Sequence, residues 1–368
     1  MIDGHLVEIV QAQIDCLSKL RANASPQLAT LFEKSLAPSD VWRAVLKERP
    51  VLDQLRRWTA PDPDPQVMRR EAAAVGLLDV TLLDLEYRRL FPSLDLGVYC
   101  ASHATGKPSL ALPLAIEEHL SEGAVYGAGA WLEGVWLEVI DAFREAVAAL
   151  VGGDLGRGDV LWYPNFSESL AALLPTLRGR LVTTAGHFTS AHYIHEVWAE
   201  RGGGEVHVVP ADEDGCVPTE RLVEALDERT TVVSLSHALY RTGYLHDLDA
   251  IAVAMAERCP EAVLLLDAYQ TLGTVPVDLS RLPSRTAVLS GGVKQLHAGT
   301  GAGFAWISNP LLDLVEPDRV GWWGHRDPLA FDHGPLDLGE GAAKLRTGTP
   351  ALVPMVALVT ELGVLATS

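Results

Sequence analysis

The sequence predicts an α/β fold in which helices cover both faces of a mainly parallel β-sheet. From about residue 96 onward, short apolar segments alternate with segments whose apolar residues recur at helical spacing. The short segments are apolar over nearly their whole length, as strands are when both faces of a sheet are buried. Several of them end in polar residues and a loop, where sheets of this kind bind their ligands.

Length and periodicity divide the chain into three predicted parts. Its 368 residues are enough for more than one domain. Residues 1–95 are predicted to form an N-terminal helical segment, because 6–20 and 38–58 carry apolar residues at helical spacing. Residues 96–335 are predicted to form the large α/β domain, and residues 336–368 the start of a truncated or minimal C-terminal region.

Seven strands are predicted in the large domain, and helices separate several of them. Each strand is a short and mostly apolar run, bounded by turn-forming residues. The strands lie within 159–165, 180–186, 205–211, 230–238, 262–270, 286–294 and 303–309. The helices lie within 134–152, 169–177, 190–203, 218–229 and 247–260.

The composition argues against several kinds of partner. Lys and Arg number 29 against 48 Asp and Glu, a net charge of -19, so the surface repels nucleic-acid phosphates and anionic lipid. No run of about 18 apolar residues predicts a membrane span, and the start of the chain has no secretory signal pattern. Four cysteines without a CxxC pair predict reduced thiols in a cytoplasmic protein, with no disulfide framework and no metal site.

Polar residues follow three of the predicted strands. Asp267 ends an apolar strand, where its carboxylate loses hydration unless a cation faces it. Lys294 follows the next strand, 27 residues later, among glycines that allow a close backbone approach. Asn165–Ser169 follow an earlier strand and open a helix, whose free N–H groups form an anion site. These groups are expected to meet beyond the carboxyl ends of the strands.

A lysine, a carboxylate and an anion site suit pyridoxal phosphate. This cofactor needs an amine for its aldehyde, a carboxylate for its ring nitrogen and a cradle for its phosphate. Lys294 would bind the aldehyde and later move protons, and Asp267 would keep the ring nitrogen protonated. An aromatic side chain usually stacks on the cofactor ring, and Phe188 or His192 could do so.

Each of these signals also has an ordinary structural explanation. A single aspartate after a strand is often a cap or turn former, and a lone lysine is usually a solvated surface group. The sequence "NFSES" alone is a common helix N-cap. The three signals in this order, on this pattern of strands and helices, favour the cofactor site.

Longer motifs resemble one family. "SHALYRTGYLHDLDAIA" precedes the aspartate strand, "LLLDAYQTLGTVPVDL" contains it, and "GGVKQLHAGTGAGF" contains the lysine. "GWWGH" (321–325), which alone would indicate a packed aromatic turn, and "RTGTP" (346–350) follow. Over about residues 97–350 the chain resembles fold-type I pyridoxal-phosphate enzymes of the class V aminotransferase group, above all kynureninase and kynureninase-like enzymes. The resemblance implies that group's large domain, with a mainly parallel seven-stranded sheet, and the cofactor pyridoxal 5'-phosphate.

The resemblance also implies roles for single residues. Lys294 matches the Schiff-base lysine, Asp267 the partner of the pyridine nitrogen and Phe188 the stacking aromatic. The other implied binding residues are Phe166 and Ser167 at the phosphate, Gln270 near the cofactor, His237 and Tyr240 flanking the ring, and Trp322, Trp323 and Thr349. In the family some of the last three reach the neighbouring subunit, so a homodimer with its site at the interface is implied.

The chain departs from kynureninases at several points. Val293 stands where they have a phosphate-binding tyrosine, and Ala191 where they have an aspartate. Only 74 residues follow Lys294, which leaves little room for the C-terminal domain whose arginine holds the substrate carboxylate in that family. Either the N-terminal helices cover the site in place of that domain, or the chain is truncated.

The resemblance leaves the reaction open. The favoured interpretation is a kynureninase-like hydrolase or lyase in amino-acid or specialised metabolism, acting by Cβ–Cγ cleavage or related β-carbon chemistry. The alternatives are an aminotransferase, a decarboxylating deaminase, a simple β-elimination enzyme and a catalytically silent scaffold. A silent scaffold has no reason to keep Lys294 and Asp267. A cysteine desulfurase is rejected, because its nucleophilic cysteine should follow the lysine and no cysteine follows Cys259.

Overall fold

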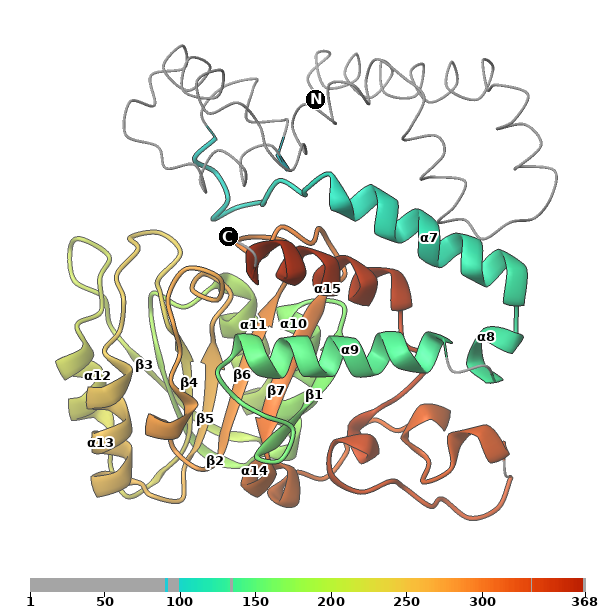
Figure 1. Cartoon of the computed structure of the whole chain (residues 1–368). Coiled ribbons are helices and arrows are strands. Elements are labelled where there is room, and N and C mark those ends of the chain that lie inside the picture. The colour runs from blue at the N-terminus through green and yellow to red at the C-terminus, as the bar shows by residue number, and fades with distance from the viewer. Residues whose placement is uncertain (1–89, 92–98, 133–134, 332, 367–368) are drawn as a thin grey trace, which may run out of the picture. The chain divides into compact units, whose positions relative to one another are not determined.

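The computed structural model describes residues 90–91, 99–132, 135–331 and 333–366. The chain divides into two compact units, one made of residues 1–89 with 117–127 and the other of residues 90–116 with 128–368. The second unit contains nearly all of the predicted large domain (Figure 1). Nearly all of the predicted segment 1–95, with its helices within 6–20 and 38–58, lies outside the described residues.

A seven-stranded sheet forms the centre of the second unit. Its strands are β1 (Gly158–Tyr163), β2 (Gly179–Thr184), β3 (Gly204–Val209), β4 (Thr230–Ser236), β5 (Val263–Asp267), β6 (Thr286–Gly291) and β7 (Gly303–Ser308). They pair in the order β1-β7-β6-β5-β4-β2-β3 (Figure 1). β7 runs antiparallel to both of its neighbours, and the other neighbouring pairs are parallel. The predicted α/β fold with a mainly parallel seven-stranded sheet is confirmed.

Each helix predicted in the large domain is present. The helices are α7 (Ala111–Tyr126), α8 (Gly129–Leu132), α9 (Val135–Leu150), α10 (Phe166–Leu173), α11 (Thr189–Glu200), α12 (Thr219–Ala225), α13 (Leu248–Arg258), α14 (Asn309–Leu314) and α15 (Leu352–Ala366). Short 3-10 turns are η2 (Leu174–Thr176), η3 (Leu279–Arg281), η4 (Trp322–Gly324), η5 (Pro328–Ala330) and η6 (Gly341–Leu345). Helix α10 begins three residues before its predicted start, because the side chain of Asn165 caps it.

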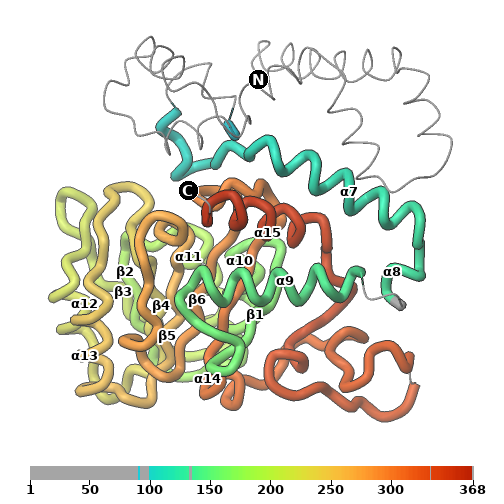
Figure 2. The backbone as a smooth tube through the Cα atoms, in the orientation of Figure 1, coloured from blue at the N-terminus to red at the C-terminus, as the bar shows by residue number. Residues whose placement is uncertain are grey.

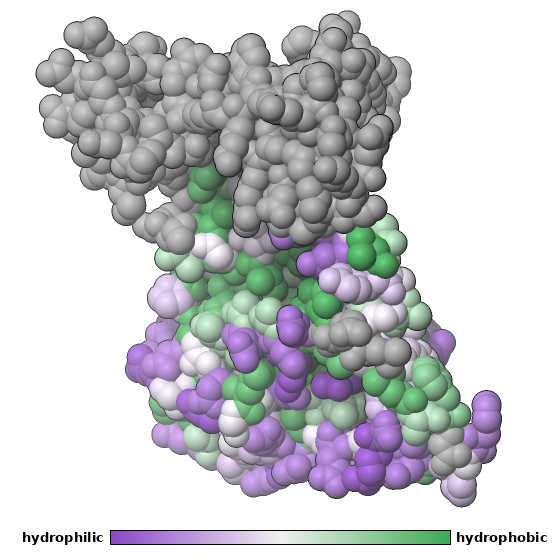
Figure 3. Space-filling model, turned by 45° about the vertical axis from the view of Figure 1, so that its right-hand side comes forward, coloured by the Kyte–Doolittle hydropathy of each residue, from purple (hydrophilic) through white to green (hydrophobic). Residues whose placement is uncertain are grey.

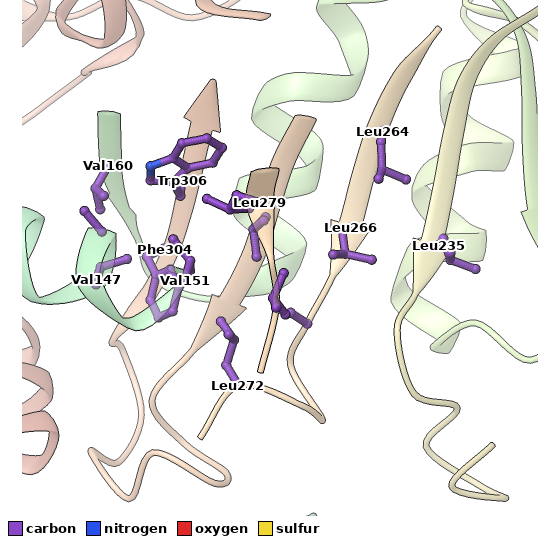
Figure 4. Packing of buried hydrophobic residues seen from close by; sticks show 14 of the residues in the cluster. Val147, Val151, Val160, Leu235, Leu264, Leu266, Leu272, Leu279, Phe304 and Trp306 are labelled. Atoms are coloured by element: carbon purple, nitrogen blue, oxygen red, sulfur yellow. The ribbon is translucent and has the colours of Figure 1, made fainter. Parts of the chain in front are cut away.

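Side chains of each strand alternate between two buried faces of the sheet. On β5, Leu264 and Leu266 pack with α9, α12, α13 and α15, whereas Val263 and Leu265 pack with α10, α11 and α14. Figure 4 shows the first of these cores, where Leu264 and Leu266 lie on the same side as Phe304 of β7. Helices α9 and α15, far apart in the sequence, lie side by side over this face (Figure 2). Burial on both faces explains why the strands are apolar almost throughout.

The surface away from this core mixes hydrophilic and apolar side chains, as the face in Figure 3 shows. Among the described residues, no helix combines the length and the hydropathy needed to cross a membrane.

The reversal of β7 matters for the position of the site. Because β7 is antiparallel to both β1 and β6, β1 points the same way as the parallel strands. Its first residue, Gly303, lies at the edge of the sheet where β1 and β6 end. A Cβ on Gly303 would lie 2.6 Å from the backbone nitrogen of Asn165, so only glycine fits beside the turn into α10.

Candidate active site

A cavity of about 200 Å³ lies at the carboxyl edge of the sheet. Residues that follow five strands, β1, β2, β4, β5 and β6, converge on it, as expected for a sheet of this kind. Its lining residues are Asn165, Phe166, Ser167, Phe188, Ser236, Tyr240, Asp267, Tyr269, Gln270, Val293 and Lys294. The structure therefore brings together seven of the residues singled out in the sequence: Lys294, Asp267, Gln270, Phe188, Phe166, Ser167 and Tyr240.

Asp267 lies at the end of β5 and is only 5% exposed. One carboxylate oxygen accepts a hydrogen bond from Ser236 Oγ at 3.1 Å, and the other accepts from the backbone N–H of Tyr269 at 2.9 Å. Burial raises the pKa of Asp267 to about 6, against the opposing effects of these two hydrogen bonds and of Lys294. At neutral pH the group is therefore mostly ionised and ready to accept a further N–H donor.

Lys294 lies three residues beyond the end of β6. Its Nζ lies 5.6 Å from the ring centroid of Phe188 and 5.2 Å from that of Tyr269. No hydrogen bond or ion pair joins this Nζ to another residue in the described part of the chain. Burial lowers the pKa of Lys294, and the charge of Asp267 opposes that shift. A lowered pKa increases the share of neutral, nucleophilic amine.

The start of α10 forms the anion-binding side of the cavity. Asn165 Oδ1 accepts from the N–H of Glu168 at 3.0 Å, and Asn165 O accepts from the N–H of Ser169. The N–H groups of Phe166 and Ser167, the first two of the helix, have no hydrogen-bond partner among the described residues. The Phe166 side chain packs in the core, so its contribution to the cavity is the backbone N–H. This arrangement suits a phosphate.

Phe188 and Tyr240 form an aromatic wall. Phe188 is 38% exposed, and its ring meets that of Tyr240 nearly at right angles, with centroids 5.2 Å apart. Its ring is open to a planar ligand, which Lys294 could hold against it. The alternative stacking residue, His192, does not line the cavity and lies instead near His187 and His195.

A segment near the N-terminal end of the second unit lies against the lysine loop. The N–H of Gly106 donates to the carbonyl of Val293 at 2.8 Å, and Gln270 Nε2 donates to the carbonyl of His103 at 3.2 Å. Farther along, the N–H and the hydroxyl of Ser109 both donate to Glu361 of α15 at 2.9 Å. We call residues 99–109 the strap. Its position against Lys294 was not predicted, although the small residues of "SHATGKPS" are compatible with such close packing.

Three residues that the sequence analysis did not single out also belong to the site. Ser236 pairs in register with Asp267 on the neighbouring strand, which explains their hydrogen bond. Tyr269 lines the cavity beside Lys294, and burial raises the pKa of its phenol to about 12. His187 Nδ1 lies 3.8 Å from Asp267 Oδ2, and burial holds the pKa of His187 well below its ordinary value, so the ring is neutral. Only the strand register could have indicated Ser236, and no sequence signal marked the other two.

Four predicted binding residues do not line this cavity. His237 donates its backbone N–H to the carbonyl of Asp267, while its ring lies 3.0 Å from the Thr271 hydroxyl. Trp323 and Thr349 line a second cavity, and Trp322 stacks on Phe331 with ring centroids 5.6 Å apart. Of the two departures from kynureninases, Val293 lines the Lys294 cavity, whereas Ala191 is fully buried in the core.

The donor set fits pyridoxal phosphate. The amine of Lys294 suits an aldehyde, the buried carboxylate of Asp267 a ring nitrogen, and the open N–H groups of α10 a phosphate. The fold and this cavity define the class, which is that of fold-type I pyridoxal-phosphate enzymes. The chain belongs to the aminotransferase class-V family, whose sequence model matches residues 99–367. The predicted family is confirmed.

Individual relatives are distant. The chain is 27% identical over 292 residues to YcbU of Bacillus subtilis, an uncharacterized aminotransferase, covering 76% of this chain and 72% of that protein. It is 29% identical over 247 residues to kynureninase of Pseudomonas fluorescens, covering 64% of this chain and 57% of the kynureninase. The chain thus spans less than two thirds of that kynureninase.

Solved structures share the fold. The cystine C-S lyase C-DES, in complex with its product cysteine persulfide, aligns with a TM-score of 0.67 at 21% identity, covering 75% of this chain and 74% of that chain. The cysteine desulfurase CsdA of Escherichia coli aligns with a TM-score of 0.66 at 23% identity, covering 78% and 72%. At such identities the likeness concerns the fold alone.

Proposed function

We propose that this chain is a pyridoxal-phosphate enzyme that breaks a bond at the β-carbon side of an amino-acid substrate, in the manner of kynureninases at Cβ–Cγ. Its cofactor is pyridoxal 5'-phosphate. One observation carries the proposal. The Lys294 amine lies between the rings of Phe188 and Tyr269, in one cavity with the buried Asp267 and the open start of α10.

The cofactor supplies an aldehyde that binds amines and a ring that accepts electrons from the carbon beside the bound amine. The N–H groups of Phe166 and Ser167 would hold its phosphate, and Phe188 would stack on its ring. Asp267 would hold a proton on the ring nitrogen, because its own oxygens already face Ser236 and the backbone of Tyr269 and are fixed in place.

Lys294 would both bind the aldehyde and move protons at the substrate. Its desolvated amine gives up a proton more readily than an exposed lysine, which suits a group that must be neutral to attack and charged to donate. Gln270 and the strap would border the substrate on the side away from α10, since the strap is hydrogen-bonded both to Gln270 and to the lysine loop.

The choice of reaction depends on the motifs and the relatives. "SHALYRTG" and "GWWGH" are kynureninase-like, and kynureninases stand among the relatives at about 28% identity. Val293 in the cavity replaces a tyrosine, which favours a substrate other than kynurenine itself. An aminotransferase, or a decarboxylating deaminase, is the second candidate, favoured by the Bacillus subtilis relative, of which the chain covers a larger share.

We also propose that the enzyme is a cytoplasmic homodimer. Trp322 and Thr349 do not line the cavity of their own chain, and Trp322 is 36% exposed beside the more exposed Phe331. In a dimer these residues would complete the cavity of the partner subunit. The described cysteines, Cys100, Cys216 and Cys259, are free thiols, in keeping with a reducing compartment. Light scattering that gives the mass of a monomer would contradict the dimer.

The test is an absorption spectrum of the purified protein with added pyridoxal phosphate. We expect a visible band in the wild type and in the control Lys344→Ala, whose lysine lies 3.9 Å from Glu316 outside the cavity. Lys294→Ala should lose the band and at least about 10³-fold in activity, the scale of a lost proton-transferring group. The absence of a band in the wild type would refute the proposal.

Products then separate the two reactions. With kynurenine, 3-hydroxykynurenine and a panel of amino acids as substrates, β-carbon cleavage releases alanine and an acidic fragment. Transamination instead consumes an oxo acid and leaves the carbon skeleton intact, so oxo-acid-dependent turnover alone would favour the second candidate.

A further inference from the structure

A second cavity borders the same turn that forms the phosphate side of the first. Its volume is about 260 Å³, larger than that of the Lys294 cavity. Pro164 and Glu168 line it, whereas Asn165–Ser167 between them line the Lys294 cavity. The remaining walls come from α9, β1 and residues 345–350. The proposed chemistry at Lys294 makes no use of this space.

One polar group in this cavity is the hydroxyl of Tyr163. Tyr163 is the last residue of β1, and its hydroxyl oxygen is buried without a hydrogen-bond partner among the described residues. Burial raises the pKa of this phenol, and the charge that opposes the shift is that of Arg319, which lines the same cavity. Buried hydroxyls are nearly always hydrogen-bonded, so an unpaired one indicates a missing partner.

The second polar group is the guanidinium of Arg346. The other two arginines of the cavity are occupied, since Arg144 binds Asp141 and Asp159 and Arg319 lies 3.4 Å from Glu168. Within the described part of the chain, no hydrogen bond or ion pair engages the Arg346 guanidinium, although burial removes much of its water and lowers its pKa. Asp141 and Asp159 act on it only at longer range. Its N–H donors are therefore available to a ligand.

Rigid aromatic walls surround these donors. Trp162 is fixed by a hydrogen bond of 2.9 Å from its Nε1 to the carbonyl of Gly301. Trp323 is buried and packs against Trp131, with ring centroids 5.5 Å apart. Phe143, a fully buried residue of α9, completes the wall. Preformed aromatic surfaces favour a flat, apolar ligand body because little entropy is lost when it binds.

We propose that this second cavity binds a small aromatic monocarboxylate. The carboxylate accepts hydrogen bonds from Arg346 and from the Tyr163 hydroxyl, and the ring packs among Phe143, Trp162 and Trp323. Arginine pairs with carboxylates through two parallel N–H donors, which fixes the orientation of the acid. The site includes neither Lys294 nor Asp267, so it is separate from the proposed reaction and from its outcome.

Calorimetric titration of benzoate into the full chain supplied with pyridoxal phosphate tests this proposal. We expect saturable binding at one site per chain, about tenfold or more weaker in Arg346→Met and a few-fold weaker in Tyr163→Phe. The matched control is Arg326→Met, whose guanidinium pairs with Asp337 and Glu340 on the surface and whose loss should leave the affinity unchanged. Cyclohexanecarboxylate and inorganic phosphate should bind more weakly than benzoate.

The variants separate this proposal from the proposed function. Lys294→Ala should bind benzoate as the wild type does, because the lysine does not line the second cavity. Loss of benzoate binding in Lys294→Ala with retention in Arg346→Met would overturn the second site and leave the first intact. Normal benzoate binding in a protein without the visible band would do the reverse.

Three other results would overturn the second site. They are no saturation in the wild type, equal weakening in Arg326→Met and Arg346→Met, and tighter binding of phosphate than of benzoate. Tyr163→Phe, which removes a single hydroxyl, keeps the test decisive if Arg346→Met does not fold. Unchanged affinity in a folded Tyr163→Phe, together with unchanged affinity in Arg346→Lys, would likewise count against the site.

Discussion

The two cavities at the turn between β1 and α10 differ in how their polar groups are satisfied. In the Lys294 cavity, Asp267 is held by Ser236 and Tyr269, so its strongest acceptor is already oriented. In the second cavity, the Tyr163 hydroxyl and the Arg346 guanidinium have no partner among the described residues. The first cavity is thus a pre-oriented reaction site, whereas the second consists of donors that await an acceptor.

The difference also has a cost on each side. Asp267 destabilises the cofactor-free protein because its carboxylate is ionised in a buried place, and Tyr163 does so because its hydroxyl is buried unpaired. Removing each group should therefore stabilise the empty protein and weaken binding in one cavity only. The predictions below separate the two effects.

The largest effect is expected for Asp267→Asn. The pKa of Asp267 in the folded protein is about 6 against an ordinary value of 3.8, so the folded state holds its proton more tightly than the unfolded state. Between about pH 4 and 6 the wild type should therefore lose stability as pH rises, by about 3 kcal/mol in total. The cofactor-free Asn variant should lack this loss and be the more stable protein at pH 8, while its activity falls at least about 10²-fold.

Urea denaturation of both cofactor-free proteins from pH 4 to pH 8 measures this. Stability curves that run parallel across the whole range would mean that the carboxylate is not the source of the loss. The same experiment with cofactor added should reverse the order, because the ring nitrogen then partners the wild-type carboxylate.

An intermediate effect is expected for Gly106→Ala in the strap. The added Cβ would lie 2.0 Å from the carbonyl oxygen of Lys294 and 2.7 Å from His297 Nδ1, so the strap or the lysine loop must move. We expect a loss of about 1–3 kcal/mol in the free energy of unfolding, together with a fall in activity.

The control is Gly363→Ala on the exposed side of α15, where nothing lies within 4 Å of the added carbon. It should gain about 0.5–1 kcal/mol from helix propensity and keep its activity. If Gly106→Ala folds and reacts like this control, the strap does not pack on the lysine loop.

The smallest effect is expected for Tyr163→Phe. Removing an unpaired buried hydroxyl should raise the free energy of unfolding by about 1 kcal/mol. Ser236→Ala makes the opposite comparison, because its hydroxyl donates to Asp267 and its removal should cost about 1 kcal/mol. Chemical denaturation of the two variants without ligand gives both values. A loss of stability in Tyr163→Phe would show that its hydroxyl already has a partner.

Much of the fold could be predicted because local patterns carry it. Apolar runs such as "VLLLD" and the Asn165 cap are signals within a few residues, and they locate the strands and the start of α10. The reversed direction of β7 could not be predicted, since an apolar strand has the same composition in either direction. That reversal aligns β1 with the other strands that end at the cavity.

The site divides in the same way. Lys294, Asp267 and Phe188 stood out because each is an unusual residue directly after a strand or its loop. Ser236 and Tyr269 are ordinary residues, and only strand register and chain folding bring them to the carboxylate and the amine. The strap lies nearly 190 residues before Lys294 in the chain, and its packing on the lysine loop has no local signal.

The sequence by itself determined the order of strands and helices, the apolar faces that bury the sheet, and the chemical types of the residues after each strand. Those properties depend on neighbouring residues and on the burial preferences of side chains. Only the tertiary structure decided which hydroxyl holds Asp267, which segment lies on the lysine loop, and that Tyr163 and Arg346 share a cavity without partners. Hydrogen bonds and cavities depend on distances of a few ångströms between residues far apart in the chain, and no local pattern specifies those distances.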